Sequence, residues 1–227
     1  MANSECRWQC PEQWSEWSEW LAAGLRARNR WRLPVLLFGM LFAGGRRTVT
    51  TWLRAAGVGD DFQDYYYCLA ALGRKIESVA NRLLALVLRT LPLPERLLLV
   101  IDDSPTKRYG PKVEGADVHH NPTPGPADQP FLYGHVWVTI SLALRHPNWG
   151  PLALPLRAML YVRRKTLASI PKERGWQRFA TKLQLAAQMV LKVTERFPQV
   201  HLRVLADHLY NGKALLNELH KHSGQVS

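Results

Sequence analysis

Residues 97–103 read Leu-Leu-Leu-Val-Ile-Asp-Asp, and this stretch decides the fold that we expect for the second half of the chain. Five consecutive apolar residues, preceded by Pro92 and Pro94, predict a strand that is buried on both faces. The strand is expected to end at the two carboxylates, because Ser104-Pro105 follows and proline cannot donate to a central ladder. A solvated turn explains such aspartates as well as a catalytic site does, since aspartate is common in turns.

A second apolar run that ends on an acid, Val204-Leu-Ala-Asp207, adds weight to the catalytic interpretation. Periodicity predicts the elements that lie around it: strands at Tyr133–Arg145, Leu152–Val162 and Val200–Ala206, and helices at Lys172–Arg196 and Lys213–His220. We expect antiparallel hairpins, then a crossover helix, then a strand parallel to the first. That order places two strand ends side by side, so Asp103 and Asp207 are expected to converge.

The first half of the sequence predicts helices. A tryptophan stripe in residues 11–32 is interpreted as a packing face, and Arg74–Thr90 predicts a further helix. Between them, Thr48 and Asp60 are expected to cap two helices that flank a glycine turn. A helical hairpin and a DNA-binding helix-turn-helix both fit this pattern, although an acidic second helix is unfavourable for entering DNA.

The connection Ser104–Pro130 is expected to lack regular structure, and connections of this length are usually functional or mobile. It carries Lys107, Arg108 and Lys112, which are either phosphate contacts or residues of a solvated loop. The paired His119 and His120 are candidate metal ligands or plain loop residues, and His208 beside Asp207 is another such candidate.

Composition narrows the class of protein. A hydrophobic content of 47% with 21% charged residues indicates a globular chain and excludes a disordered one. The net charge of +12 and the pI of about 10.0 indicate a polyanionic partner, with nucleic acid before an anionic membrane surface. Three cysteines without a second ligand pair fit a reducing compartment rather than a disulfide framework or a zinc site. No signal peptide or membrane span is expected, because the apolar run Leu33–Phe42 is too short.

Two carboxylates at adjacent strand ends are ligands suited to a hard divalent cation such as Mg²⁺ or Mn²⁺. In a two-metal site, such ions flank a scissile phosphate, activate the attacking oxygen and stabilise the leaving one. Together with the positive charge of the chain, Asp103 and Asp207 therefore suggest phosphodiester chemistry on DNA or RNA.

Three stretches resemble the DDE transposases of insertion sequences, and most closely the IS4/IS701-like group. They are Val-Ile-Asp-Asp-Ser-Pro-Thr-Lys at 100–107, Tyr-Gly-His-Val-Trp-Val at 133–138 and Val-Leu-Ala-Asp-His-Leu-Tyr at 204–210. The resemblance covers roughly residues 35–222. It implies an α/β fold, with a ribonuclease-H-like mixed sheet preceded by an α-helical region. We accordingly expect a helical region over 1–92 and a DDE catalytic core over 93–227.

In that family, two aspartates and a later glutamate bind the catalytic metal ions. The resemblance assigns the first role to Asp103, with Asp102 as the alternative, and the second to Asp207. Adjacent strand residues point to opposite faces, so only one of the first pair is expected to be a ligand. Only Glu218 follows Asp207, and it lies too close to take the third role. The chain is therefore expected to be truncated and inactive by itself, as a remnant, a frameshifted product or part of a split reading frame.

The leading hypothesis is a DNA transposase fragment that acts on element ends and target DNA, as a homo-oligomer in its synaptic complex. The resemblance implies a bacterial, cytoplasmic protein that is nucleoid-associated when bound to DNA. Two alternatives remain: a non-catalytic DNA-binding remnant, and another nuclease of the ribonuclease-H-like fold.

Overall fold

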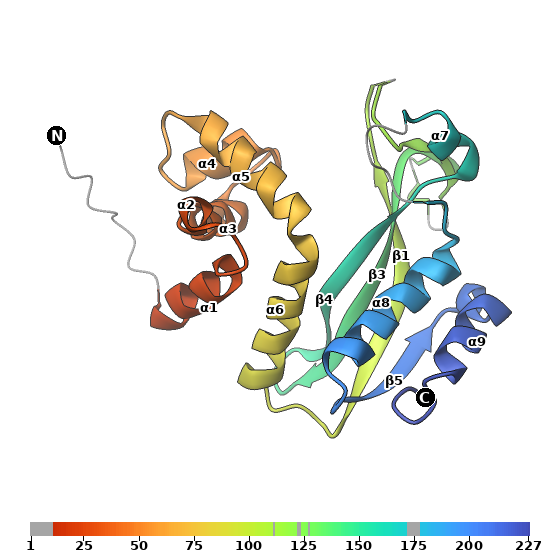
Figure 1. Cartoon of the computed structure of the whole chain (residues 1–227). Coiled ribbons are helices and arrows are strands. Elements are labelled where there is room, and N and C mark those ends of the chain that lie inside the picture. Colours follow the sequence, from red (N-terminus) through yellow and green to blue (C-terminus); the bar gives the residue numbers. More distant parts are fainter. Residues whose placement is uncertain (1–10, 111, 122–123, 127, 172–177) are drawn as a thin grey trace. The chain divides into compact units, whose positions relative to one another are not determined.

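The computed structural model describes residues 11–110, 112–121, 124–126, 128–171 and 178–227 (Figure 1). The chain divides between Pro92 and Leu93 into two compact units, a helical one and a second one built on a sheet. The elements of the first unit are α1 (Glu12–Ala22), α2 (Ala27–Arg30), α3 (Arg32–Phe42), α4 (Val49–Ala55), α5 (Phe62–Arg74) and α6 (Ile76–Thr90). Those of the second are β1 (Arg96–Lys107), β2 (Asp117–His120), β3 (Phe131–His146), β4 (Gly150–Tyr161), α7 (Arg164–Ala168), α8 (Lys182–Arg196), β5 (His201–Ala206), the 3₁₀ helix η2 (His208–Tyr210) and α9 (Lys213–His220).

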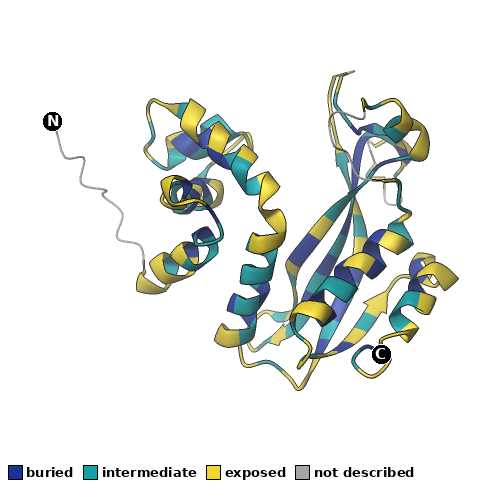
Figure 2. Ribbon diagram, in the orientation of Figure 1, coloured by how far each residue is buried: buried dark blue, intermediate teal, exposed yellow. Residues whose placement is uncertain are grey.

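The first unit is organised around a small apolar core. Its buried members are Ala22, Leu25, Leu33, Leu36, Leu53, Tyr65 and Cys68 (Figure 2). Helices α3 and α4 approach closely at Gly39, where an added Cβ would lie 2.1 Å from the carbonyl oxygen of Trp52. The glycine is therefore required for this contact between the two helices.

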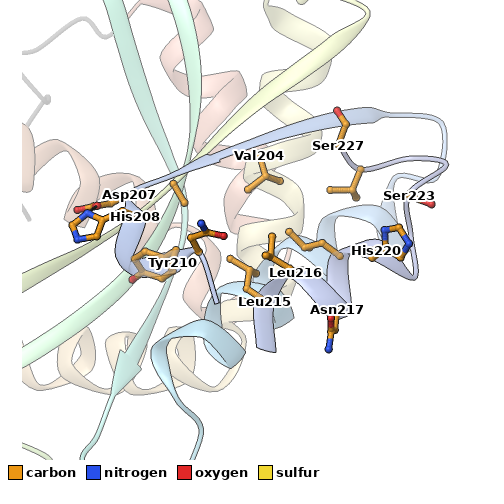
Figure 3. Close-up of a pocket in the computed structure, with 14 residues that line it drawn as sticks. Val204, Asp207, His208, Tyr210, Leu215, Leu216, Asn217, His220, Ser223 and Ser227 are labelled. Carbon is orange, nitrogen blue, oxygen red and sulfur yellow. Dashed lines mark ion pairs between the residues drawn. The ribbon is translucent and has the colours of Figure 1, made fainter. Parts of the chain in front are cut away.

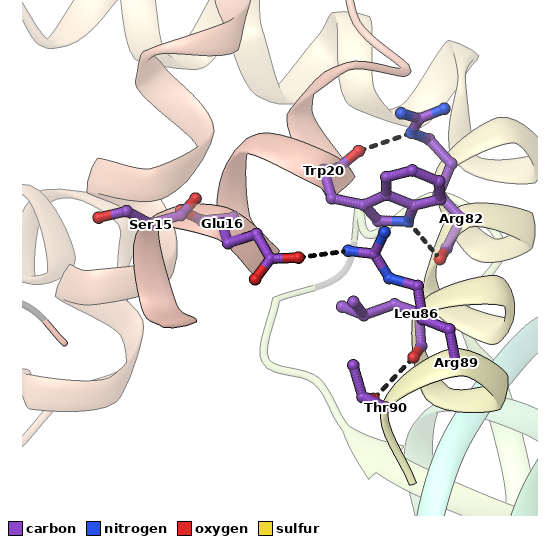
Figure 4. Close-up of polar contacts among 8 residues, drawn as sticks. Ser15, Glu16, Trp20, Arg82, Leu86, Arg89 and Thr90 are labelled. Atoms are coloured by element: carbon purple, nitrogen blue, oxygen red, sulfur yellow. Dashed lines mark hydrogen bonds and ion pairs between the residues drawn. The ribbon is translucent and has the colours of Figure 1, made fainter. Parts of the chain in front are cut away.

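The prediction that the tryptophan stripe is a packing face holds for only part of the stripe. The buried residues of α1 are Ser18 and Ala22, whose small side chains let the helix lie close to its neighbours, while Trp17 and Trp31 are exposed. Trp20 instead joins α1 to α6 (Figure 4). Its indole N–H donates to the carbonyl oxygen of Arg82 at 2.9 Å, and its ring lies beneath the guanidinium groups of Arg82 and Arg89.

The two helices predicted after residue 44 are present, but only one predicted cap is confirmed. The Thr48 hydroxyl accepts a hydrogen bond from the Thr51 N–H at 3.3 Å and starts α4. The prediction for Asp60 is wrong, because the residue before α5 is Asp61. It lies in the left-handed region with φ 56° and makes no side-chain cap. The helix predicted to start at Arg74 starts at Ile76, since Arg74 still belongs to α5.

The second unit confirms the expected mixed α/β fold. Strands follow the order β2-β3-β1-β5, with β4 also paired to β3, and β1 runs antiparallel to β3 but parallel to β5. Helix α8 is the crossover that makes this parallel pair possible, and its buried residues, which include Ala186, Met189 and Val190, pack on one face of the sheet (Figure 1). The chain's last residues also pair with β5, where the Leu202 N–H donates to the Gln225 carbonyl at 2.8 Å.

The prediction that β1 ends at the two aspartates is wrong. The strand continues to Lys107, and Pro105 pairs with Val136 of β3. The ladder with β5, however, stops at the pair Ile101–Ala206. Beyond that pair β1 is an edge strand, so proline at 105 removes no donor that a second neighbour would need. The connection after 104 is also less irregular than predicted, because it holds the rest of β1 and the short strand β2.

Strand β4 pairs only with β3 among the described strands, and its register shifts between Ile140 and Ser141, next to Pro155. Proline is tolerated at sheet edges and at bulges, and Pro155 lies at both.

The helix predicted from Lys172 begins at Lys182. Thr181 and Gln184 form a capping box, which fixes the start of α8, while Phe179 and Ala180 precede the helix. Trp176, which lies within the range of the predicted helix, is outside the described residues.

Candidate functional site

The site is centred on the carboxylate of Asp103. Residues 97, 99 and 101 of β1 are buried on the face that α8 covers, and strand alternation places Asp103 on that same face. The Asp103 side chain is 15% exposed. Lys182 Nζ lies 2.6 Å from Asp103 Oδ2, and the Tyr210 hydroxyl donates to Oδ1 at 3.1 Å. Both oxygens of the buried carboxylate therefore have a partner.

Local structure brings these two partners to the carboxylate. The capping box makes Lys182 the first residue of α8, at the end of the helix nearest to Asp103. On the other side, Asp207 caps η2, and this short helix turns Tyr210 back into the unit, where only 3% of the residue is exposed.

The electrostatic environment of Tyr210 locates the acids of the site. Its pKa is raised well above the ordinary value of a tyrosine, first by burial and then by the negative charge of Asp103 and the hydrogen bond to it. The charges of Asp102 and Asp207 raise this pKa further. The phenol therefore keeps its proton and acts as a neutral donor among three carboxylates.

Asp207 lies directly after β5, the parallel neighbour of β1, whereas Asp103 lies within β1, two residues beyond the last β1–β5 pair. The Asp207 side chain is 54% exposed, forms an ion pair with the His208 ring and accepts a hydrogen bond from the Leu209 N–H. Asp102 is exposed, and alternation puts it on the face opposite Asp103; its carboxylate accepts a hydrogen bond from the Asp103 N–H at 2.7 Å.

A pocket of about 710 Å³ adjoins the site along β5 and α9 (Figure 3). Asp207 and His208 lie at one end of it and Ser227 at the other, while Leu215 and Leu216 form part of its apolar wall. The pocket thus opens from the second acid toward an apolar surface.

The three predicted phosphate contacts follow Asp103 in the sequence, at the end of β1 and beyond it. Lys107 ends β1, four residues and therefore roughly 13 Å along the strand from Asp103. The Arg108 side chain is partly engaged, because its Nε–H donates to His135 Nδ1 at 3.1 Å. Lys112 is exposed, as is Tyr109, whose ring lies 5.7 Å from the Lys107 ammonium.

The paired histidines do not join the acids. His119 is buried in β2 against Tyr161, and its pKa is lowered by burial and then by the positive charge of Arg163. His120 contacts Phe131 instead. Over the part of the chain that the structure describes, no three His, Cys, Asp or Glu side chains gather into a group that could hold a metal ion.

The donor set suits a hard cation nonetheless. Asp103 in β1 and Asp207 after β5 are the residues that would offer carboxylate oxygens to such an ion, and Mg²⁺ often takes only one or two carboxylates, with water and substrate phosphate completing its shell. One feature opposes occupancy at Asp103, since the Lys182 ammonium already lies against it.

Sequence reasoning missed both residues that hold Asp103. Lys182 was hidden inside a longer predicted helix, so nothing marked it as a first-turn residue. Tyr210 belonged to a stretch quoted for the family resemblance, but a lone tyrosine after a strand carries no signal of its partner. The Thr181–Gln184 spacing was the one available clue, because it is a capping-box pattern.

A family model described as DDE superfamily endonuclease matches residues 21–226. No curated protein and no solved structure matches the chain significantly. Among the described residues, no helix is long and apolar enough to cross a membrane.

Proposed function

Because the chain belongs to the DDE superfamily endonuclease family, we propose that it is a DNA transposase of an insertion sequence, which cuts and joins DNA ends by metal-dependent phosphodiester chemistry. The observation that supports this most is the position of the two acids on adjacent parallel strands. Asp103 lies within β1, and Asp207 directly follows β5. We extend the proposal to the IS4/IS701-like group, on the quoted stretches around both acids.

In this proposal Asp103 and Asp207 hold Mg²⁺ or Mn²⁺, which activates the attacking oxygen and stabilises the leaving oxygen of the phosphodiester. Tyr210 keeps the Asp103 carboxylate oriented through its hydrogen bond. Lys107, Arg108 and Lys112 contact DNA phosphates, and the net charge of +12 on the chain lowers repulsion between protein and substrate.

The helical unit is proposed as a further DNA contact. Its α4–α5 pair is joined through Gly57, whose φ is 78°, in the manner of a helix-turn-helix. Asp64 in the first turn of α5 forms an ion pair with Arg32, which offsets part of the unfavourable negative charge there. Exposed Arg46, Arg47 and Arg54 supply positive charge near α4.

We also propose that these residues alone show little or no cleavage of DNA with Mg²⁺. Two divalent ions carry four positive charges, whereas Asp103 and Asp207 offer two negative ones before the substrate phosphate arrives. Firm metal binding is therefore expected only with DNA present, as is assembly of two or more copies on paired element ends.

A binding titration and a nicking assay test the proposal. With about six phosphate contacts, the affinity for duplex DNA should fall about a thousandfold between about 50 and 200 mM salt, with or without Mg²⁺. Slow nicking of supercoiled plasmid in Mn²⁺ should disappear in Asp103→Asn and Asp207→Asn but persist in Asp102→Asn.

Glu218→Gln is the matched control, because Glu218 is an exposed acid that pairs only with Lys221 among the described contacts. Nicking that is lost in Asp102→Asn but kept in Asp103→Asn would show that Asp102, and not Asp103, is the ligand. Salt-independent binding, or none, would argue against a nucleic-acid partner altogether. DNA binding with no Asp103-dependent metal binding would favour the alternative function of a non-catalytic DNA-binding protein.

A further inference from the structure

We infer that Lys182 occupies the place of the metal ion at Asp103 and must withdraw before a divalent cation binds there. The inference rests on the proposed function, because it assigns a role to a residue beside the proposed metal ligand. It adds a residue that the pair of acids does not include, and it predicts that metal affinity is set by competition with the chain's own cation.

The contact geometry supports competition. Lys182 Nζ lies 2.6 Å from Asp103 Oδ2, and a divalent cation binds a carboxylate oxygen at about 2.1 Å. A metal ion and the ammonium on the same oxygen would thus be within a few ångströms of each other, with three positive charges around one negative charge. Like charges at that separation repel strongly at the edge of a protein interior, so the two occupants exclude each other.

The environment of Asp103 explains why a cation is held there at all. The side chain is only 15% exposed, and a carboxylate this far from water requires a counterion. Tyr210 cannot fill that role, because a tyrosine hydroxyl is neutral at neutral pH and supplies a hydrogen bond but no charge. Lys182 is the described cation whose ion pair with Asp103 meets the requirement.

Lys182 also has room to move its side chain away from Asp103. Its side chain is 37% exposed, and the ring of Tyr161 lies 5.9 Å from its ammonium. A lysine at the first position of α8 can turn toward water or toward that aromatic face without disturbing the helix, because its side chain lies outside the backbone hydrogen bonds. Withdrawal therefore needs only a rotamer change.

The first test is calorimetric titration of the full chain with Mn²⁺ in the absence of DNA. Lys182→Met should bind Mn²⁺ about tenfold more tightly than the unaltered chain. In this variant the metal ion no longer has to displace an ammonium group from Asp103, so no binding energy is spent on breaking the ion pair. Lys182→Arg keeps the charge and should behave like the unaltered chain. Lys107→Met removes the same charge four residues from Asp103 along β1, outside the ion pair, and serves as the control for net charge.

The outcomes separate this inference from the proposed function. Equal or weaker Mn²⁺ binding by Lys182→Met, with binding still lost in Asp103→Asn, would overturn the competition and leave the metal site standing. An equal gain in Lys107→Met would also overturn it, since net charge would then explain the effect. No Mn²⁺ binding by any of these chains, in the presence of duplex DNA as well as in its absence, would overturn both the inference and the metal-dependent function.

A second measurement uses the unaltered chain, so it does not depend on Lys182→Met folding. A released ammonium reacts more readily with an acylating reagent than one held by a carboxylate. Brief acetylation followed by peptide mass spectrometry should show severalfold more modification of Lys182 when Mn²⁺ is saturating, with Lys107 unchanged as the internal control. Reactivity of Lys182 that stays constant or falls with Mn²⁺ would refute the withdrawal.

Discussion

Replacing Tyr210 by phenylalanine removes one hydroxyl and leaves the buried ring in place. The hydroxyl donates to Asp103 Oδ1 at 3.1 Å, and Tyr210 is 3% exposed, so solvent cannot replace the lost donor. Hydrogen bonds to charged groups are worth about 1.5–3 kcal/mol, and one of this length belongs at the lower end of that range. Lys182 still neutralises the carboxylate, so we expect the variant to lose about 1.5 kcal/mol of unfolding free energy in the second unit.

For a unit of this size, such a loss lowers the melting temperature by roughly 4–6 °C. Circular dichroism melts of the full chain and urea titrations at neutral pH measure it. Tyr109→Phe is the matched control, because Tyr109 is exposed and its hydroxyl is free to bond to water, so its melting temperature should not change.

The two partners of Asp103 should also be coupled. In a Lys182→Met background the carboxylate depends on Tyr210 alone, so Tyr210→Phe should cost more there than in the unaltered chain. A Tyr210→Phe melting temperature equal to that of Tyr109→Phe, with additive effects in the double variant, would refute the reasoning that both groups hold one partly buried charge.

Two further predictions concern stability. Gly39→Ala should destabilise the helical unit by more than about 2 kcal/mol, because the added Cβ would lie 2.1 Å from the Trp52 carbonyl oxygen. Gly44→Ala is the control and should be tolerated, because its added Cβ would meet nothing within 4 Å. Equal urea midpoints for the two variants would contradict this prediction. The second unit should lose stability as the pH falls from about 7.5 to about 5.5, because the pKa of buried His119 is lowered and the unfolded chain takes up a proton that the folded chain does not. His119→Phe removes this titration, so its urea midpoint should fall less over the same range, and an unchanged pH dependence would exclude His119 as the cause.

Local patterns predicted most of the strands and helices of the second unit, but they missed the short elements β2 and α7. The alternation in β3 and the acid that follows β5 were both visible in the sequence, and α9 was predicted with its observed bounds. The right-handed crossover rule then required β5 to lie parallel to β1, as observed. Pairing rules are general, so the topology could be derived without knowing any individual contact.

Element ends were predicted less well, because tertiary context determines them. Pro105 was expected to stop β1, yet the strand continues since β5 no longer flanks it there. The start of α8 was predicted ten residues early, because apolar spacing continued through residues that precede the Thr181 cap. For β1 the end of pairing with a neighbouring strand decided the outcome, whereas for α8 a local capping box decided where the helix began.

The choice between Asp102 and Asp103 shows the same dependence on tertiary structure. The sequence gives two adjacent acids, and strand alternation states only that they face opposite ways. The structure differentiates them, because α8 covers the face that bears Leu99 and Ile101, and its first residue, Lys182, contacts Asp103. Asp102 on the open face is solvated and needs no counterion. Asp103 is the better candidate ligand, because its carboxylate is partly buried and is held by a cation that a metal ion can replace. The packing of α8 on the sheet therefore distinguishes Asp103 from Asp102, rather than any feature of the two acids themselves.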